Sequence, residues 1–538
     1  MADLPFVALT SMLTEATGLR LLDWIVIGTY AAGMLLLGVA IARQQKTTRD
    51  YFLASGRMSS SLVGISIAAT FISTLSYLTI PGEMIGRGPV YLWALLSVPF
   101  YYLIVGYVLI PAIMKRQVTS AYEIVEPKLG LSGRLFAATI FILMRLIWMG
   151  LMVHVAAETM VLILGLEPSS RFGIILITGA IAVGYTALGG LRAVIITDAI
   201  QFFLLLGGAL LTIAMVSANM DGWDWWPTSW SPRWDEQPWF SWDPYVRATT
   251  VGSIVSFATF WICNAGSDQV TIQRFMATGT PHAARRAYLI NVIASTLVTV
   301  VLAITGFAVL GFFTNHPELL PKNFDWSNQS DDLFPRFVTH HLPAGCSGLV
   351  VSAMFAAVMS SLDSGINSVS AVILVDFVGR CFGVQLNPRN ELRMARCLTV
   401  VVGIGIVLAA ILVAETPGNI LAVTNKTANL LAPPLFVLLF LALAVPFATP
   451  FGSIFGATYG ITIGSLIAFW DVITGSPSIS FQWIGITSLI VGVASGVLLS
   501  LLPTRGRSVA ALASYSAAAL LPIIASIGWA LAVRLSAA

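Results

Sequence analysis

The chain has 538 residues, of which 57% are hydrophobic and 10% are charged, and its formal net charge is +3. Soluble proteins carry roughly 25% charged residues, so this composition excludes an ordinary soluble protein. The small net charge argues against a nucleic-acid partner. Four cysteines without CxxC spacing argue against a disulfide framework or a cysteine metal site.

A membrane-spanning helix needs about 20 mostly apolar residues, and fourteen segments of this chain are close to that length or longer. In chain order, the predicted spans are 22–43, 60–85, 90–114, 135–165, 172–188, 193–217, 248–273, 287–314, 346–378, 397–414, 419–446, 452–470, 484–502 and 509–533. The segment before the first span lacks a basic start and a small-residue cleavage site, so we expect that span to be retained. The predicted fold class is therefore an all-α membrane protein with about 14 transmembrane helices.

Lysine and arginine residues are unevenly distributed between the loops. If the N-terminus lies outside, the inner loops hold most of the 28 Lys and Arg residues, including Arg274. The positive-inside rule then predicts that both termini lie outside a plasma (inner) membrane. The long loops 218–247 and 315–345 also fall outside. The first carries seven of the fifteen tryptophans, which form either a lid over a solute or, more commonly, an aromatic belt at the lipid headgroups.

The second span, 60–85, is rich in hydroxyl groups and ends in helix-breaking residues. Its polar and helix-breaking positions are Thr70, Ser73, Thr74, Ser76, Thr79, Pro81 and Gly82. Such a stretch is typical of a broken membrane helix, whose freed carbonyl groups can coordinate a cation. A continuous helix packed closely through its small residues is the alternative.

The ninth span, 346–378, contains an aspartate among serines. The residues Ala357, Ser360, Ser361 and Ser364 follow i, i+3, i+4, i+7 spacing and share one helix face, with Asp363 at its edge. Hydroxyl and carboxylate oxygens without His or Cys suit an alkali cation better than zinc or copper.

A second intramembrane acid, Asp198, lies in the sixth span beside Thr197 and Gln201. Charges inside a span usually mark a transport pathway. Two acids on separate helices could share one cation, which would lower the cost of burying both. An ion pair with Arg145 or Lys426, or a protonated acid, would also explain them.

Several motifs in their order and spacing resemble the sodium:solute symporters, the family of the sodium–glucose, proline and sialic acid transporters. The motifs are RDYFLASGR at 49–57, IAATFIS…PG at 67–82, VTSAYEIVEPKLG at 118–130, GYTALGGLRAVIITDAIQ at 184–201, SDQVTIQRFMA at 267–277, AAVMSSLDSGINS at 356–368 and LAPPLFVLLFLAL at 431–443. The likeness covers nearly the whole chain.

The resemblance implies a leucine-transporter type of fold, in which two inverted five-helix repeats surround a site at the membrane midplane. The expected parts are an extra N-terminal helix with its inner loop (1–59), the first repeat (60–217), the Trp-rich outer loop (218–247), the second repeat (248–446) and three C-terminal helices (447–538). The second span becomes core helix 1, and the serine-bearing span becomes core helix 8.

The resemblance also implies one or two Na+ sites. The main site would use the carbonyl groups of Ala69, Ile72 and Ala357 and the hydroxyl groups of Ser360 and Ser361. The second site, present in some members, would use Asp198, Ser360, Asp363 and Ser364. Many members have Ser or Thr where this chain has Asp363, which leaves the sodium stoichiometry and any proton coupling open.

Residues at the family's solute-contact positions differ from those of the galactose transporter. The Asn and Tyr of its core helix 6, with their neighbouring Trp, correspond here to WICNAGSDQ, and its core helix 1 Gln corresponds to Ser76. The expected solute-binding residues are Ser73, Ser76, Arg145, Trp261, Asn264, Asn425 and Lys426. Two cations within spans favour an anionic solute, unless both pair with acids or extend to the membrane surface.

We therefore expect a sodium-coupled symporter that imports a small organic solute by alternating access, with an anionic solute (sugar acid, sialic acid or carboxylate) preferred over a neutral sugar or polyol. A channel fits less well because of the symporter motifs and the inverted repeat that they imply, and a membrane sensor fits less well because no soluble output domain is evident. No hydrolase, Walker or dinucleotide motif indicates an enzyme. The expected partners are the solute and the lipid bilayer, without nucleic acid or an obligate protein partner.

Overall fold

The computed structural model describes residues 19–42, 45–236, 238–412, 420–504 and 509–537, and within these ranges its regular structure is helical. The main helices are α2 (Leu21–Ala42), α3 (Thr48–Leu53), α4 (Ser60–Phe71), α5 (Thr74–Gly86), α6 (Val98–Ile104), α7 (Ile110–Met114), α8 (Glu126–Ile163), α9 (Arg171–Asn219), α10 (Thr250–Ser267), α11 (Gln269–Ala277), α12 (Pro281–Asn315), α13 (Leu333–His341), α14 (Cys346–Val372), α15 (Pro388–Leu412), α16 (Ile420–Ala444), α17 (Pro450–Ala468), α18 (Trp470–Thr474), α19 (Gln482–Ser500) and α20 (Val509–Ala537).

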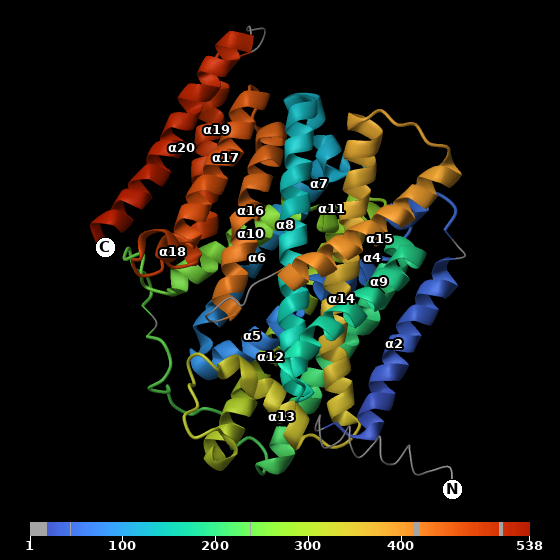
Figure 1. Ribbon diagram of the computed structural model, residues 1–538, viewed down its shortest axis with the longest axis vertical. Coiled ribbons are helices and arrows are strands. Elements are labelled where there is room, and N and C mark those ends of the chain that lie inside the picture. The colour runs from blue at the N-terminus through green and yellow to red at the C-terminus, as the bar shows by residue number, and fades with distance from the viewer. Residues whose placement is uncertain (1–18, 43–44, 237, 413–419, 505–508, 538) are drawn as a thin grey trace.

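Helix α14 forms the centre of the bundle, in contact with α2, α4, α8 and α9 (Figure 1). In its most apolar stretch 89% of the residues are buried, against 11% in α20. Helices α17, α19 and α20 stand on one side of the bundle, and α2 stands on the other. The small and hydroxyl residues of α14 allow this close packing, whereas the outer helices expose leucine and isoleucine as lipid-facing helices do.

Two helices are interrupted in the middle of the protein. Helix α4 ends at Phe71, Ile72 leaves helical geometry (φ −86°, ψ 84°), and α5 begins at Thr74, so the second predicted span is a broken helix. Asp268, with φ −77° and ψ 124°, separates α10 from α11. Pro81 lies inside α5, which remains helical through it. Each break leaves backbone groups free of the helical hydrogen-bond pattern, as a coordination site requires.

Ten helices of the described residues are long and apolar enough to cross a membrane, or eleven if the bent pair α3 and α4 is one span. The 49 residues of α9 cover two predicted spans, 172–188 and 193–217, which non-helical backbone at Gly190 (φ 57°) divides. The two halves of the first broken helix, α4 with 12 residues and α5 with 13, are each too short to count as a span. The total of 14 spans remains a prediction.

The Trp-rich loop after α9 is anchored in the protein. Trp225 and Trp234 are buried, with Trp225 packed against Gly311 of α12, while Trp242 is 80% exposed. Arg247, at the end of the loop, donates two hydrogen bonds of 2.8 Å to the buried carboxylate of Glu83 on α5. This loop is therefore tied to the half-helix that follows the first break.

Candidate functional site

Hydroxyl groups of α14 meet the carbonyl groups at the end of α4. Ser360 donates to the carbonyl oxygen of Ala69 at 2.9 Å and lies 3.4 Å from that of Ala357, and Ser361 donates to the carbonyl oxygen of Thr70 at 2.8 Å. All five of these residues are buried. The structure thus brings the residues expected for the main sodium site to one place, beside the helix break at Ile72.

A second polar cluster joins α9 and α14 through the acids. The hydroxyl of Ser364 lies 3.1 Å from Asp363 Oδ1 and 3.0 Å from the hydroxyl of Thr70, which in turn lies 3.4 Å from Asp198 Oδ2. The hydroxyl of Tyr185 donates to Asp363 Oδ2 at 2.8 Å. Asp198, Asp363 and Ser364 are therefore neighbours, whereas Ser360 makes its hydrogen bonds within the first cluster.

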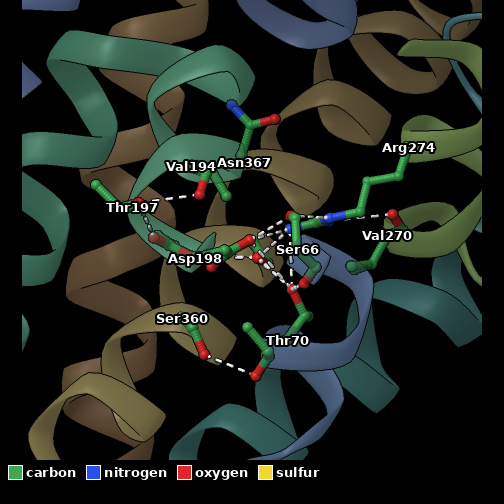
Figure 2. Close-up of polar contacts among 12 residues, drawn as sticks. Ser66, Thr70, Val194, Thr197, Asp198, Val270, Arg274, Ser360 and Asn367 are labelled. Carbon is green, nitrogen blue, oxygen red and sulfur yellow. Dashed lines mark hydrogen bonds and ion pairs between the residues drawn. The ribbon is translucent and has the colours of Figure 1, made fainter. Parts of the chain in front are cut away.

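Arg274 enters this cluster from α11, as Figure 2 shows. Its side chain is fully buried, and its Nη2 lies 2.9 Å from Asp198 Oδ2 and 2.5 Å from the hydroxyl of Ser364. Its Nε donates to Ser66 at 2.8 Å, and Ser66 donates to Asp198 at 2.5 Å. Asp198 Oδ1 has no hydrogen-bond partner among the described residues.

Arg274 corrects two expectations from the sequence. The sequence places Arg274 in an inner loop, because it directly follows the apolar part of the predicted span 248–273. The sequence also suggests Arg145 or Lys426 as the partner of Asp198 in an ion pair, whereas the partner in the structure is Arg274. The signal that could have identified Arg274 is the motif SDQVTIQR, in which an acid, two glutamines and an arginine continue from an apolar helix.

A cavity lies next to the two helix breaks. Its smaller part is lined by Ser73, Arg145, Asn264 and Asp268, and Phe71, Trp148 and Phe260 are shared with its larger part. The larger part has a volume of about 1300 Å³, including space that is open to solvent, and Ser76, Trp261 and Gln482 are among its lining residues. The aromatic rings pack against one another, with Phe71 5.3 Å from Trp261 between ring centroids.

Arg145 is the buried cation of this cavity. Its guanidinium forms an ion pair with Asp268, and its carbon atom Cζ lies 5.8 Å from the centre of the Phe71 ring. Asn264 Nδ2 lies 3.4 Å from the same carboxylate. The Nε of Arg145 has no hydrogen-bond partner among the described residues. Asp268, which sequence reasoning did not select, thus partly neutralises the cavity.

Lys426 was also expected to bind the solute, but it lies away from this cavity. Its ammonium group is 3.5 Å from Asp471 on α18, and it lines neither part of the cavity. A partly exposed lysine next to a carboxylate keeps its hydration and needs no solute charge. The side chain of Asn425 lies outside the described residues.

Comparison with known proteins identifies the family of this chain. The sequence profile of the sodium:solute symporter family matches residues 51–460. The sodium/sialic acid symporter NanT of Aliivibrio fischeri is 29% identical, over 78% of this chain and 82% of that protein. The corresponding figures for the sodium/sialic acid symporter SiaT of Proteus mirabilis are 28%, 77% and 83%.

A solved structure of an outward-open, substrate-bound Na+-coupled sialic acid symporter aligns with a TM-score of 0.74 at 25% identity, covering 89% of this chain and 97% of that one. The nucleobase-cation symporter MHP1 aligns with a TM-score of 0.52 at 13% identity, over 84% of this chain and 94% of its own, which shows a common fold. The all-helical chain, with its two broken helices, therefore belongs to the sodium:solute symporter family, whose members are sodium-coupled membrane transporters and not enzymes.

Proposed function

We propose that this protein couples the inward sodium gradient to the import of a small solute that carries a carboxylate, by alternating access. The observation that carries the proposal is Arg145, a buried guanidinium in an aromatic-walled cavity beside both helix breaks, with a free Nε donor. A carboxylate suits a guanidinium because it can accept two parallel hydrogen bonds. The sialic acid symporters among the relatives transport a solute of this type.

A neutral sugar or polyol is the competing solute. The observation in its favour is Asp268, which already neutralises Arg145, so that the hydroxyl and amide groups of Ser73, Ser76 and Asn264 become the remaining polar contacts. The two candidates differ in what they require from Arg145. Only a carboxylate needs its positive charge.

Within this function, we assign the main sodium site to Ala69, Ile72, Ala357, Ser360 and Ser361. They offer three carbonyl and two hydroxyl oxygens at the end of α4, where the helix break frees the last carbonyl groups. A set of hard, neutral oxygen ligands fits a monovalent cation, and burial keeps competing water away.

We assign a second cation site to Asp198, Asp363 and Ser364. Asp198 pairs with the guanidinium of Arg274, and Asp363 is joined to it only through Ser364. The described cluster therefore retains one negative charge when both acids are ionised. An uncompensated buried charge is costly, and one bound Na+ would remove it. The free Oδ1 of Asp198 is an available ligand atom.

The division into inverted repeats, 60–217 and 248–446, remains part of the proposal. Its support is that the first helix of each proposed repeat is the broken one, at Ile72 and at Asp268. The protein is a multi-pass membrane protein, and we propose outer termini because most Lys and Arg residues then lie inside.

Solute binding to the purified full chain tests the proposal. Thermal stability would be measured with sialic acid, lactate and glucose, each in sodium and in potassium. We expect stabilisation by sialic acid or lactate in sodium, and a loss of affinity of about 10-fold or more in Arg145→Gln, since hydrogen bonds to charged groups contribute about 1.5–3 kcal/mol. Binding of glucose alone, unchanged in Arg145→Gln, would favour the neutral solute.

A further inference from the structure

The short helix α11 lies between the solute cavity and the cation cluster. Asp268, directly before its first residue, reaches into the cavity, and Arg274, in its last turn, reaches into the cation cluster. The two residues are six positions apart, which corresponds to about 9 Å along a helix. All nine residues of α11 are buried. One rigid element therefore carries a charged group of each site.

At the cavity end, Asp268 has two roles. Its Oδ1 accepts a hydrogen bond of 2.8 Å from the backbone N–H of Val270, which caps the start of α11, and its Oδ2 pairs with Arg145. A solute carboxylate at Arg145 would compete with this second oxygen. A movement of the Asp268 side chain would therefore change the hydrogen bond at the first turn of α11, because the same carboxylate caps that turn.

At the cation end, Arg274 occupies ligand atoms that a bound cation would also use. Its Nη2 contacts Asp198 Oδ2 at 2.9 Å and the Ser364 hydroxyl at 2.5 Å. The guanidinium and a sodium ion thus compete for the negative charge of Asp198. A small displacement of α11 away from α9 would weaken the ion pair and leave more of that charge to sodium.

Between the two ends, Gln269 and Gln273 join α11 to neighbouring segments of the protein. Gln269 donates to the carbonyl oxygen of Thr119 at 2.7 Å, and Gln273 donates to that of Phe52 at 2.5 Å. Gln273 also accepts from Ser368 at 2.6 Å. These bonds hold α11 in one position until the contacts at its ends change, because a closely packed element shifts between discrete positions instead of deforming gradually.

We propose that α11 couples solute binding to cation binding, with Asp268 and Arg274 as the positioning residues at its two ends. A solute anion that replaces Asp268 at Arg145 releases the start of α11, the Arg274–Asp198 pair loosens, and sodium binds more tightly at Asp198. Linkage requires the reverse effect, so bound sodium also favours the solute by the same factor. The solute step rests on the proposed function; the link between Asp268 and the cation cluster does not.

A double-mutant cycle in sodium alone tests this link without any solute. The sodium dissociation constant of the full chain would be measured by thermal stability at constant ionic strength for wild type, Asp268→Asn, Arg274→Gln and the double variant. Arg274→Gln removes the competing cation, so we expect sodium to bind about 5-fold or more tightly. Asp268→Asn keeps a capping oxygen but loses the ion pair, so it should also tighten sodium binding. This effect should disappear in the Arg274→Gln background.

The control is Asp471→Asn, which removes the partner of Lys426 on α18, a helix that contacts α17 and α20 and lies outside both sites. When this control is combined with Arg274→Gln, the two fold-changes in the sodium dissociation constant should multiply to within about 2-fold, as they do for independent sites. If Arg274→Gln does not fold, Arg274→Met, which also removes the charge, completes the same cycle. An Asp268→Asn effect that is absent, or equal in both backgrounds, overturns the proposal.

A second experiment repeats the sodium titration in the presence of sialic acid. Saturating sialic acid should tighten sodium binding to wild type by about 5-fold or more, and should no longer do so in Asp268→Asn. Failure of sialic acid to bind wild type would count against the proposed solute, whereas the sodium cycle would still decide the role of α11. Undiminished coupling in Asp268→Asn would overturn the role of α11 while leaving the proposed function intact.

Discussion

Replacing Ser361 by alanine is the most direct perturbation of the main sodium site. The hydroxyl of Ser361 is buried and lies 2.8 Å from the carbonyl oxygen of Thr70 at the end of α4. The variant removes one of five proposed oxygen ligands and leaves a buried polar site short of a partner, at a cost of about 1–3 kcal/mol. Since 1.4 kcal/mol corresponds to a factor of ten, the sodium concentration for half-maximal binding should rise about 5- to 150-fold.

The assay is a sodium titration of the thermal stability of the purified protein, repeated for transport in proteoliposomes. Ser352→Ala is the matched control, because Ser352 is also a buried serine of α14, but its hydroxyl bonds to Gly348 within the same helix at 2.7 Å. This control should leave the sodium dependence within about 2-fold of wild type. An unchanged sodium dependence in Ser361→Ala would refute the assignment of the main site.

Three further predictions concern other parts of the protein. Asp363→Asn should lower the number of sodium ions moved per solute while preserving the fold, and reversal potentials at several gradients measure it; equal stoichiometry would remove Asp363 from the second site. Arg145→Lys should bind a carboxylate more weakly than wild type, because an ammonium lacks the paired donors of a guanidinium; equal affinity would contradict bidentate binding. Gly190→Ala should destabilise the fold by about 1–3 kcal/mol, seen as a lower Tm, because its φ is 57° and a Cβ there would lie 2.6 Å from the carbonyl oxygen of Tyr51; an unchanged Tm would show that this backbone relaxes freely.

Much of the fold could be predicted because the bilayer imposes simple rules on sequence. Apolar length indicated the membrane helices, and helical periodicity correctly placed Ser360, Ser361 and Ser364 on one buried helix. The hydroxyl-rich second span indicated a possible break, which the structure locates at Ile72. These features depend on neighbours within one helix, so the sequence carries them directly.

The partners of the buried charges could not be predicted in the same way. Arg274 pairs with Asp198, 76 positions earlier, and Arg145 pairs with Asp268, 123 positions later. Sequence periodicity gives the face of a helix but not the helix that faces it. The predicted span 248–273 ends directly before Arg274, so the sequence places Arg274 in a loop although its side chain is fully buried.

Sodium-driven accumulation of a carboxylate is the central claim, and uptake into proteoliposomes tests it most directly. Labelled sialic acid would be supplied outside vesicles that contain the full chain, with an inward gradient of either sodium or potassium at the same ionic strength. The account predicts accumulation above the outside concentration with sodium, which collapses when a sodium ionophore removes the gradient. Equal uptake in potassium, or equilibration without accumulation, would contradict it.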